Sequence, residues 1–179
     1  IAGAARAPML TSAQIAALST SQVPGLGTFQ VNALLTSQVE AMTTAQWSAF
    51  STAAIAALSS AQILAIETQD VASLNSAHLQ TLSSVQVLAL STAQIVALTT
   101  DQMLGLSGAN VRALSSAQLQ AIETVDLAVL SNANLAALGT TQVAALATTQ
   151  VLALSTSQAA GLGSAFMTGL RTDQIGAFE

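Results

Sequence analysis

The chain repeats one pattern of apolar and polar positions almost throughout. An apolar anchor recurs every eighth residue from Leu10 to Phe178, through 21 octads without an insertion. Counted from this anchor, the consensus octad is Leu, Ser/Thr, Ser/Thr, Ala, Gln, Ile/Val, a variable residue and Ala. The anchor is Leu except at Met42, Phe50, Ile66, Ile122 and Phe178. A short period of this kind predicts a repeat architecture.

Neither one long helix nor a β-solenoid fits this period. Eight residues at about 100° each advance an apolar stripe by about 80° per octad, so the stripe would wind around a continuous helix. In a strand the first and sixth positions have opposite parity and would face opposite sides. Ala, Leu and Gln favour helix. The sequence therefore predicts an all-α solenoid of very short helices, one per octad, stacked into a rod.

The restart signal of each helix is a capping box. In the octad that begins at Leu90, Ser91 is predicted as the N-cap, Gln94 as the N3 residue and Ile95 as the N4 residue that packs on the anchor. Helices of about six residues are too short to be stable alone, so successive octads must share a core. A rival register, with the third-position Ser/Thr as N-cap, remains open but loses the glutamine of the box.

The charged residues agree with this phasing. Arg112 falls near a predicted helix C-terminus, where a cation is favoured, whereas Glu40 and Arg171 are placed against the rule. Six acidic residues fall between N-cap and N3, where the helix dipole favours them: Glu67, Asp70, Asp101, Glu123, Asp126 and Asp173.

The last two octad positions predict opposite environments. The eighth is mostly Ala or Gly and is expected where coils approach closely, with Gly25, Gly105 and Gly161 as C-terminal or corner residues. The seventh varies freely and is expected to face outward. Pro24 predicts a local distortion or a cap.

A longer period overlies the octads. Residues 59–106 match residues 115–162 at an offset of seven octads. Duplication of a seven-octad block is the favoured interpretation; the alternative is that seven octads complete a whole number of turns, such as two turns of about three and a half octads each. The predicted organisation is a non-repeat segment, 1–9, followed by one octapeptide-repeat solenoid, 10–179. An Ile at position 1 indicates a processed chain or an excerpt of a longer one.

Composition narrows the function. Only 6% of the 179 residues are charged, the net charge is −5, and the three basic residues are scattered arginines. Nucleic-acid binding is therefore not expected, since phosphate contacts need clustered Lys and Arg. Without cysteine there is no disulfide or thiolate metal site. No membrane span is expected either, because Ser, Thr and Gln interrupt every octad.

Candidate chemistry is sparse. His78, the single histidine, occupies the fifth-position slot of Gln, where a hydrogen bond at the cap is favoured over catalysis or metal binding. The pairs Glu67/Asp70 and Glu123/Asp126 could share a cation, but calcium needs six to eight oxygen ligands, so a role at the cap and the dipole is favoured. Core or end-cap packing is expected for the aromatic residues that break the pattern: Phe29, Trp47 and Phe166. We predict no catalytic, cofactor-binding or metal-binding residue and no cofactor.

Two resemblances bear on these expectations. The run "LTTDQMLGL" from Leu98 is similar to the first helix of TAL-effector repeats, in which a Thr caps a short helix; the resemblance covers one helix, and DNA binding does not carry over. Over nearly the whole chain the octads resemble the "LTTAQIAAL"-type repeat tracts of large bacterial cell-surface and adhesin-type proteins. This resemblance implies an extracellular spacer or fibre-forming segment rather than an enzyme.

The expected function is structural. The chain is predicted to be a segment or subunit of an extracellular bacterial filament, sheath or adhesin stalk that associates with itself, end to end or laterally, through an open C-terminal coil. Ice or flat-surface binding by regular Thr/Ser ladders is one alternative. A protein-binding scaffold is another, and an enzyme is the least expected class.

Overall fold

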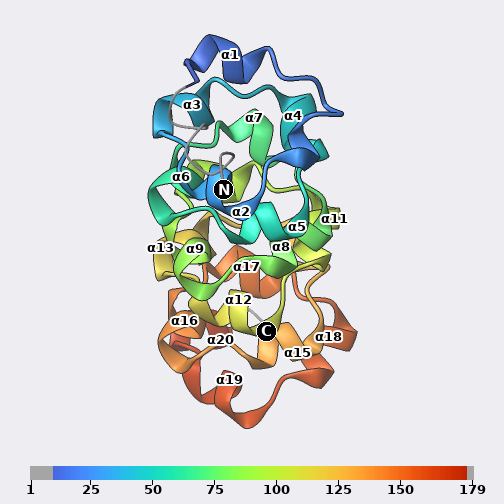
Figure 1. Cartoon of the computed structure of the whole chain (residues 1–179). Helices are drawn as coiled ribbons and strands as arrows, with labels where there is room; N and C mark the ends of the chain where they lie inside the picture. The colour runs from blue at the N-terminus through green and yellow to red at the C-terminus, as the bar shows by residue number, and fades with distance from the viewer. Residues whose placement is uncertain (1–9, 177–179) are drawn as a thin grey trace. The chain divides into compact units, whose positions relative to one another are not determined.

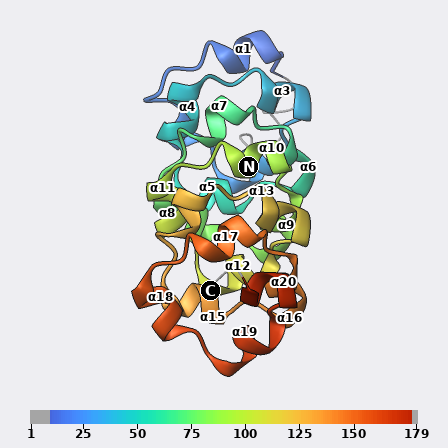
Figure 2. The same ribbon diagram turned by 180° about the vertical axis from the view of Figure 1, so that it is seen from behind.

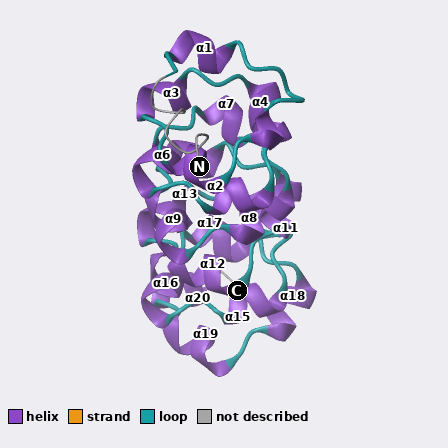
Figure 3. Ribbon diagram, viewed as in Figure 1, coloured by secondary structure: helices purple, strands orange, loops and turns teal. Residues whose placement is uncertain are grey.

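The computed structural model describes residues 10–176, and within this range every regular element is a helix (Figures 1 and 3). Short loops separate the helices, which have four to six residues apart from one 3₁₀ turn of three residues, η2. The predicted all-α solenoid with one helix per octad is confirmed. The predicted segment 1–9 and the last anchor, Phe178, lie outside the described residues.

The chain divides into two compact units, Ile1–Leu90 and Ser91–Glu179. Unit 1 contains α1 (Ser12–Ala16), η2 (Val23–Gly25), α2 (Thr28–Asn32), α3 (Thr36–Glu40), α4 (Thr44–Ala49), α5 (Thr52–Ala56), α6 (Ser60–Leu64), α7 (Thr68–Val71), α8 (Ser76–Thr81) and α9 (Ser84–Ala89). Unit 2 contains α10 (Thr92–Val96), α11 (Thr100–Leu104), α12 (Gly108–Ala113), α13 (Ser116–Ala121), α14 (Thr124–Leu127), α15 (Asn132–Ala136), α16 (Thr140–Ala145), α17 (Thr148–Leu152), α18 (Thr156–Gly161), α19 (Ser164–Gly169) and α20 (Thr172–Ile175).

The helices begin where the capping box predicts. Ser91 has extended backbone angles, φ −70° and ψ 160°, and is the N-cap of α10. Its amide donates to Oε1 of Gln94 at 2.8 Å, and the Gln94 amide donates to the Ser91 hydroxyl at 3.1 Å. These reciprocal bonds satisfy two amides that a helix start leaves without partners. The second octad position is therefore the N-cap, and the rival register is wrong.

The helices end without any left-handed residue. In α6 the eighth-position Ala65 keeps helical angles, φ −79° and ψ −8°, whereas after α9 the anchor Leu90 is extended, φ −62° and ψ 133°. Among the described residues none has a positive φ, so Ala serves as well as Gly at these ends. The close-approach interpretation holds for Gly161, where a Cβ would meet the side chain of Asn132, but is wrong for Gly25, which has nothing within 4 Å.

The core of each unit is built from the anchors and the N4 residues. In unit 1, Ile63 at N4 is 1% exposed and the anchor Leu58 is 4% exposed; in unit 2, Leu135 and Leu138 are equally buried. The seventh position faces outward as predicted, since Leu64, directly after Ile63, is 57% exposed. Adjacent residues of the same short helix can therefore differ sharply in burial.

Helices pack against the helix three octads further along the chain. In unit 1, α5 lies beside α8, and in unit 2, α16 lies beside α19 (Figures 1 and 2). One helix, α15, also packs against α19, which is four octads away. A turn of the solenoid therefore contains between three and four octads.

Pro24 distorts its octad, as predicted. The chain forms the 3₁₀ turn η2 there instead of an α-helix, with Pro24 in the first turn. The helix that packs on this turn is α4, which carries the fully buried Trp47 at N4. The distorted octad and the largest side chain of the core are therefore neighbours.

No helix within residues 10–176 has both the length and the apolar character needed to cross a membrane.

The difference in burial between Ile63 and Leu64 predicts unequal effects for two adjacent substitutions. Ile63→Ala is expected to lower the free energy of unfolding by about 2–5 kcal/mol, because it leaves a cavity in the core of unit 1. Leu64→Ala, the matched control on the exposed side of α6, is expected to change it by less than about 0.5 kcal/mol. Urea unfolding followed by circular dichroism measures both. Equal losses for the two variants would contradict the assigned faces.

Candidate functional site

The fifth-position glutamines connect one turn of the solenoid to the previous one. Gln46 at N3 of α4 accepts the Thr43 amide with its Oε1 at 2.8 Å. Its Nε2 donates to the carbonyls of Ile15 at 2.9 Å and Leu18 at 2.7 Å. The side chain is 1% exposed, and its acceptor and both amide hydrogens are used. One residue therefore caps its own helix and binds the C-terminal carbonyls of an earlier helix.

We call this set of bonds the N3 ladder, and it runs through both units. As in Gln46, the donor reaches back 28 residues to an anchor carbonyl and, for most glutamines, 31 residues to an N4 carbonyl. In unit 1 the ladder includes Gln38, Gln46, Gln62, His78 and Gln86. In unit 2 it includes Asn134, Gln142, Gln150, Gln158 and Gln174.

Three octads show that the N3 glutamine binds its N-cap amide even where the N-cap side chain cannot cap the helix. At Leu35, Gly139 and Ala147 the N-cap residue has no side-chain acceptor, yet its amide still donates to Oε1 of the glutamine at N3, at 2.7–2.9 Å. The variation at the second octad position is thereby explained. The N-cap side chain is replaceable, whereas the N3 amide serves both the helix and the ladder.

The spacing of the ladder gives the length of one turn. A bond to the residue 28 positions earlier spans three and a half octads, midway between the contacts at three and at four octads. We call this stretch of three and a half octads a coil. Seven octads then make two coils. The long sequence period therefore corresponds to a whole number of turns, the alternative to a simple duplication. A duplicated block of seven octads preserves the geometry of the coils.

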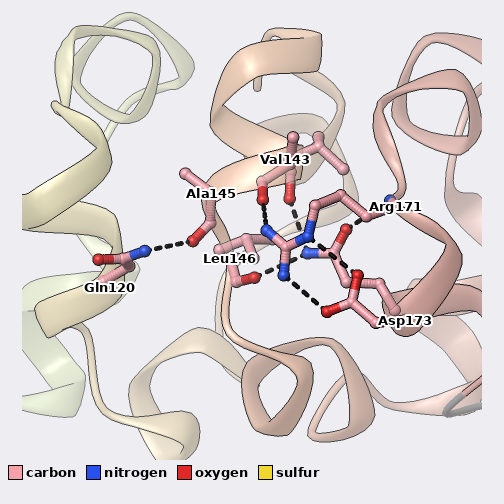
Figure 4. Close-up of polar contacts among 8 residues, drawn as sticks. Gln120, Val143, Ala145, Leu146, Arg171 and Asp173 are labelled. Carbon is pink, nitrogen blue, oxygen red and sulfur yellow. Dashed lines mark hydrogen bonds and ion pairs between the residues drawn. The ribbon is translucent and has the colours of Figure 1, made fainter.

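A second, exposed set of bonds runs in the opposite direction. At the seventh octad position, Asn32 donates to the carbonyl of Ala57 at 3.0 Å and Arg112 to that of Ala137 at 3.1 Å. Gln120 likewise donates to the carbonyl of Ala145 at 2.8 Å (Figure 4). Each bond reaches 25 residues forward to an eighth-position carbonyl. Arg112 lies in the last turn of α12, as predicted. Its side chain binds the carbonyl of Ala137 at the C-terminal end of α15.

Arg171 is the N-cap residue of α20, and its side chain binds a carbonyl of another helix, α16. Its guanidinium forms a bidentate pair with Asp173, at 3.0 Å for both bonds, and donates to the carbonyl of Ala144 in α16 (Figure 4). The hydrogen bonds from Arg171 lower the pKa of Asp173. Arg171 and Asp173 are exposed, so this pair contributes little to stability. Glu40 is the last residue of α3, where the helix dipole disfavours a negative charge, as predicted.

The two predicted acidic pairs occupy equivalent places in the two units. Asp70 is 1% exposed, and its Oδ1 accepts the Thr44 hydroxyl at 2.7 Å; Asp126, seven octads later, accepts the Thr100 hydroxyl at 2.9 Å. Burial raises the pKa of Asp70, the Thr44 bond opposes it, and Glu67 raises it further.

The glutamates of these pairs, Glu67 and Glu123, are the N-cap residues of α7 and α14, at the end of the helix where the dipole favours an acid, but they form no side-chain cap bond. The carboxylate of Glu67 instead accepts a hydrogen bond from the side-chain Nε2 of Gln69 at 2.7 Å. Within residues 10–176, no three His, Asp or Glu side chains are grouped as metal ligands would be.

The aromatic residues have different environments. Trp47 and Phe166 are buried, as expected, and Trp47 lies 5.2 Å from Phe50 between ring centres. Phe29 is 77% exposed, so its expected core or end-cap packing is wrong. It lies at N2 of α2, a position directed away from the core, and lines an open pocket of about 260 Å³ with Thr28, Asn32 and Ala57, none of which is ionisable.

Comparison with known proteins supports the repeat. Residues 63–100 and 119–156 match the family model of the ALTTAQ repeat. The two matches are seven octads apart, so the same part of the two-coil period is recognised twice. The six letters of the name correspond to the chain from the eighth position of one octad, through anchor, N-cap, N1 and N2, to the N3 glutamine. The search of curated proteins found no match. The chain is therefore a repeat protein, two segments of which match the ALTTAQ repeat.

The ladder predicts unequal effects for two glutamines of unit 2. Gln150→Ala is expected to lower the free energy of unfolding by about 2 kcal/mol, because it removes the donor to the Ile122 carbonyl and the second donor to the Leu119 carbonyl. The matched control is Gln120→Ala, which removes one exposed bond and is expected to cost less than about 0.5 kcal/mol. Urea unfolding at pH 7 measures both. Similar costs would show that the ladder does not stabilise the coils.

Asp70→Asn is expected to stabilise unit 1 at neutral pH by about 1 kcal/mol. The shorter amide at Asn134 already donates to the Leu106 carbonyl at 2.9 Å, so an amide at position 70 can make the same bond. Because the folded pKa of Asp70 is raised above 3.8, its contribution to stability is present below pH 3.8 and is lost as the pH rises through the folded pKa. The advantage of the variant should therefore shrink as the pH approaches 4.

Thermal unfolding between pH 7 and pH 4 measures this difference. The control is Asp101→Asn, which changes an exposed acid in the first turn of α11 and should leave the transition within about 0.5 kcal/mol of the parent. A destabilised Asp70→Asn variant at pH 7 would show that the Thr44 bond outweighs the burial of the charge.

Proposed function

We propose that this chain is a structural segment of an extracellular bacterial filament, sheath or adhesin stalk, in which coils are added end to end. The observation that carries the proposal is the N3 ladder, because one set of bonds joins each coil to the previous one without depending on any particular partner residue. The anchors that accept these bonds differ in identity, as Leu18 and Ile122 do, and only their carbonyl groups are used. Any coil with this backbone can therefore receive the next.

The N-terminal coil of unit 1 presents the donor half of the ladder. Gln14 and Gln22 accept the amides of Thr11 and Ser19 at 2.9 Å, as the buried glutamines do at their own N-caps. Their side chains are exposed, whereas Gln46 in the next coil is buried. A preceding coil, from the same polypeptide or from a second copy, would offer their Nε2 groups the carbonyls that Gln46 uses.

The last described coil of unit 2 presents the acceptor half. The anchors Leu154, Leu162 and Leu170 are half-buried, whereas Leu146 is fully buried and its carbonyl accepts Gln174 at 2.7 Å. A following coil would cover these side chains and donate to their carbonyls. The two surfaces are complementary in hydrogen bonding and in apolar character, which supports head-to-tail contact between copies of this chain.

Electron microscopy of the purified chain over a concentration series tests the proposal. We expect fibres whose number and length increase with concentration. Particles that stay monodisperse at every concentration would contradict end-to-end assembly and favour a spacer or a surface-binding protein, for which the exposed Ser/Thr residues at N1 would be the next target.

A double substitution tests the interface itself. Gln14→Glu with Gln22→Glu keeps an acceptor for each N-cap amide but removes the donors to the preceding coil, so it should abolish fibres while the helices persist. The control pair, Gln80→Glu with Gln120→Glu, adds the same charge at exposed seventh positions. Fibres that survive the first pair as well as the second would contradict the ladder contact.

A further inference from the structure

One member of the N3 ladder is titratable in the mildly acidic range. His78 at N3 of α8 is 1% exposed and takes the slot that glutamine holds elsewhere. Its Nδ1 lies 3.3 Å from the Asn75 amide, and its Nε2 lies 3.0 Å from the carbonyl of Phe50. An amide can only donate and a carbonyl can only accept. The ring must therefore be neutral, with its proton on Nε2.

Protonation changes what this ring can bind. An imidazolium carries a proton on both nitrogens, so Nδ1 would face the Asn75 amide donor to donor. The cap of α8 would lose a bond, because the Asn75 amide would have no acceptor on the ring. The bond from Nε2 to Phe50 is present in the neutral ring and strengthens on protonation, but it does not replace the acceptor that the Asn75 amide loses.

Within unit 1, the helices on the Phe50 side of the ring offer no charge to stabilise an imidazolium. Helix α5, which packs against α8, has no ionisable residue, and α4, which precedes Phe50, has none either. The acids nearest in the chain, Glu67 and Asp70, belong to the preceding helix, α7, and neither contributes to the shift. Burial lowers the pKa of His78, and the Phe50 carbonyl opposes this effect only in part.

We propose that His78 makes the joint between α8 and the preceding coil an acid-sensitive connection, which opens in mildly acidic solution while the glutamine joints of unit 1 stay closed. Glutamine performs the same two tasks with an amide that does not titrate in this range, so the sensitivity is confined to one coil. The proposal concerns a single chain and holds whether or not copies assemble end to end.

The direction of the effect follows from linkage. Because the folded pKa of His78 lies below 6.5, the unfolded chain takes up the proton first as the pH falls. The stability contributed by the neutral ring is complete above pH 6.5 and decreases below it, until the folded form is protonated too. Asp70 acts in the opposite direction toward low pH, so variants must be compared with the parent at each pH.

The decisive comparison uses His78→Gln, which installs the residue of the other octads. Hydrogen exchange of the α8 amides and urea unfolding, measured from pH 8 to pH 5, should show at least a severalfold loss of protection and stability in the parent. The variant should show no corresponding loss beyond the intrinsic pH dependence of exchange. Parallel curves for the two proteins would overturn the proposal.

Two further measurements guard against a variant that folds poorly. Since the chain has a single histidine, its NMR titration can be followed without assignment in the unmodified protein, and a midpoint at or above 6.5 would overturn the proposal. Moving the group, by Gln62→His in the His78→Gln background, should transfer the acid sensitivity to α6, because Gln62 holds the same slot. A transfer variant without acid sensitivity would also contradict the proposal.

Discussion

The structure depends on a side-chain amide that makes three hydrogen bonds at once. A helix of about five residues cannot satisfy its own ends, because its first amides and last carbonyls have no partners within the helix. The N3 glutamine supplies an acceptor to its own N-cap and donors to the end of an earlier helix, as Gln62 does for Ser59, Val31 and Leu34. Both deficits are met by one buried residue. Helices far below the length that is stable in isolation can therefore form a packed structure.

The coil length of three and a half octads determines which features recur. Helices pack on the helix three octads away, α15 also packs on the helix four octads away, and equivalent places recur after seven octads. The acid at Asp70 and its counterpart Asp126 lie one such period apart and make the same bond to a threonine. The sequence duplication and the structural period are therefore consistent with each other, because a block of seven octads adds two complete coils and leaves the contacts between coils unchanged.

Much of this fold could be predicted from local chemistry. The pairing of Ser91 with Gln94 in one octad identifies the helix start, and the outward seventh position follows from its variability. The second task of glutamine could not be found in this way, because its partner lies in the previous coil and that distance depends on how the coils close. For the same reason the sequence identifies His78 as a cap residue but not its bond to the carbonyl of Phe50 in the previous coil. The core packing predicted for Phe29 is wrong because its size indicates a core residue, whereas its N2 position in the octad directs it outward.

The geometry of the ladder also determines how a unit would respond to mechanical load. Since most octads are held to the previous coil by their own N3 bonds as well as by their buried anchor and N4 side chains, tension applied at one end would reach the contacts of the terminal octad before those of the next. Release would proceed octad by octad, and each step would add a contour length on the order of 25 Å. A unit built in this way would extend under force in small, reversible increments, like an elastic element, instead of yielding in one event.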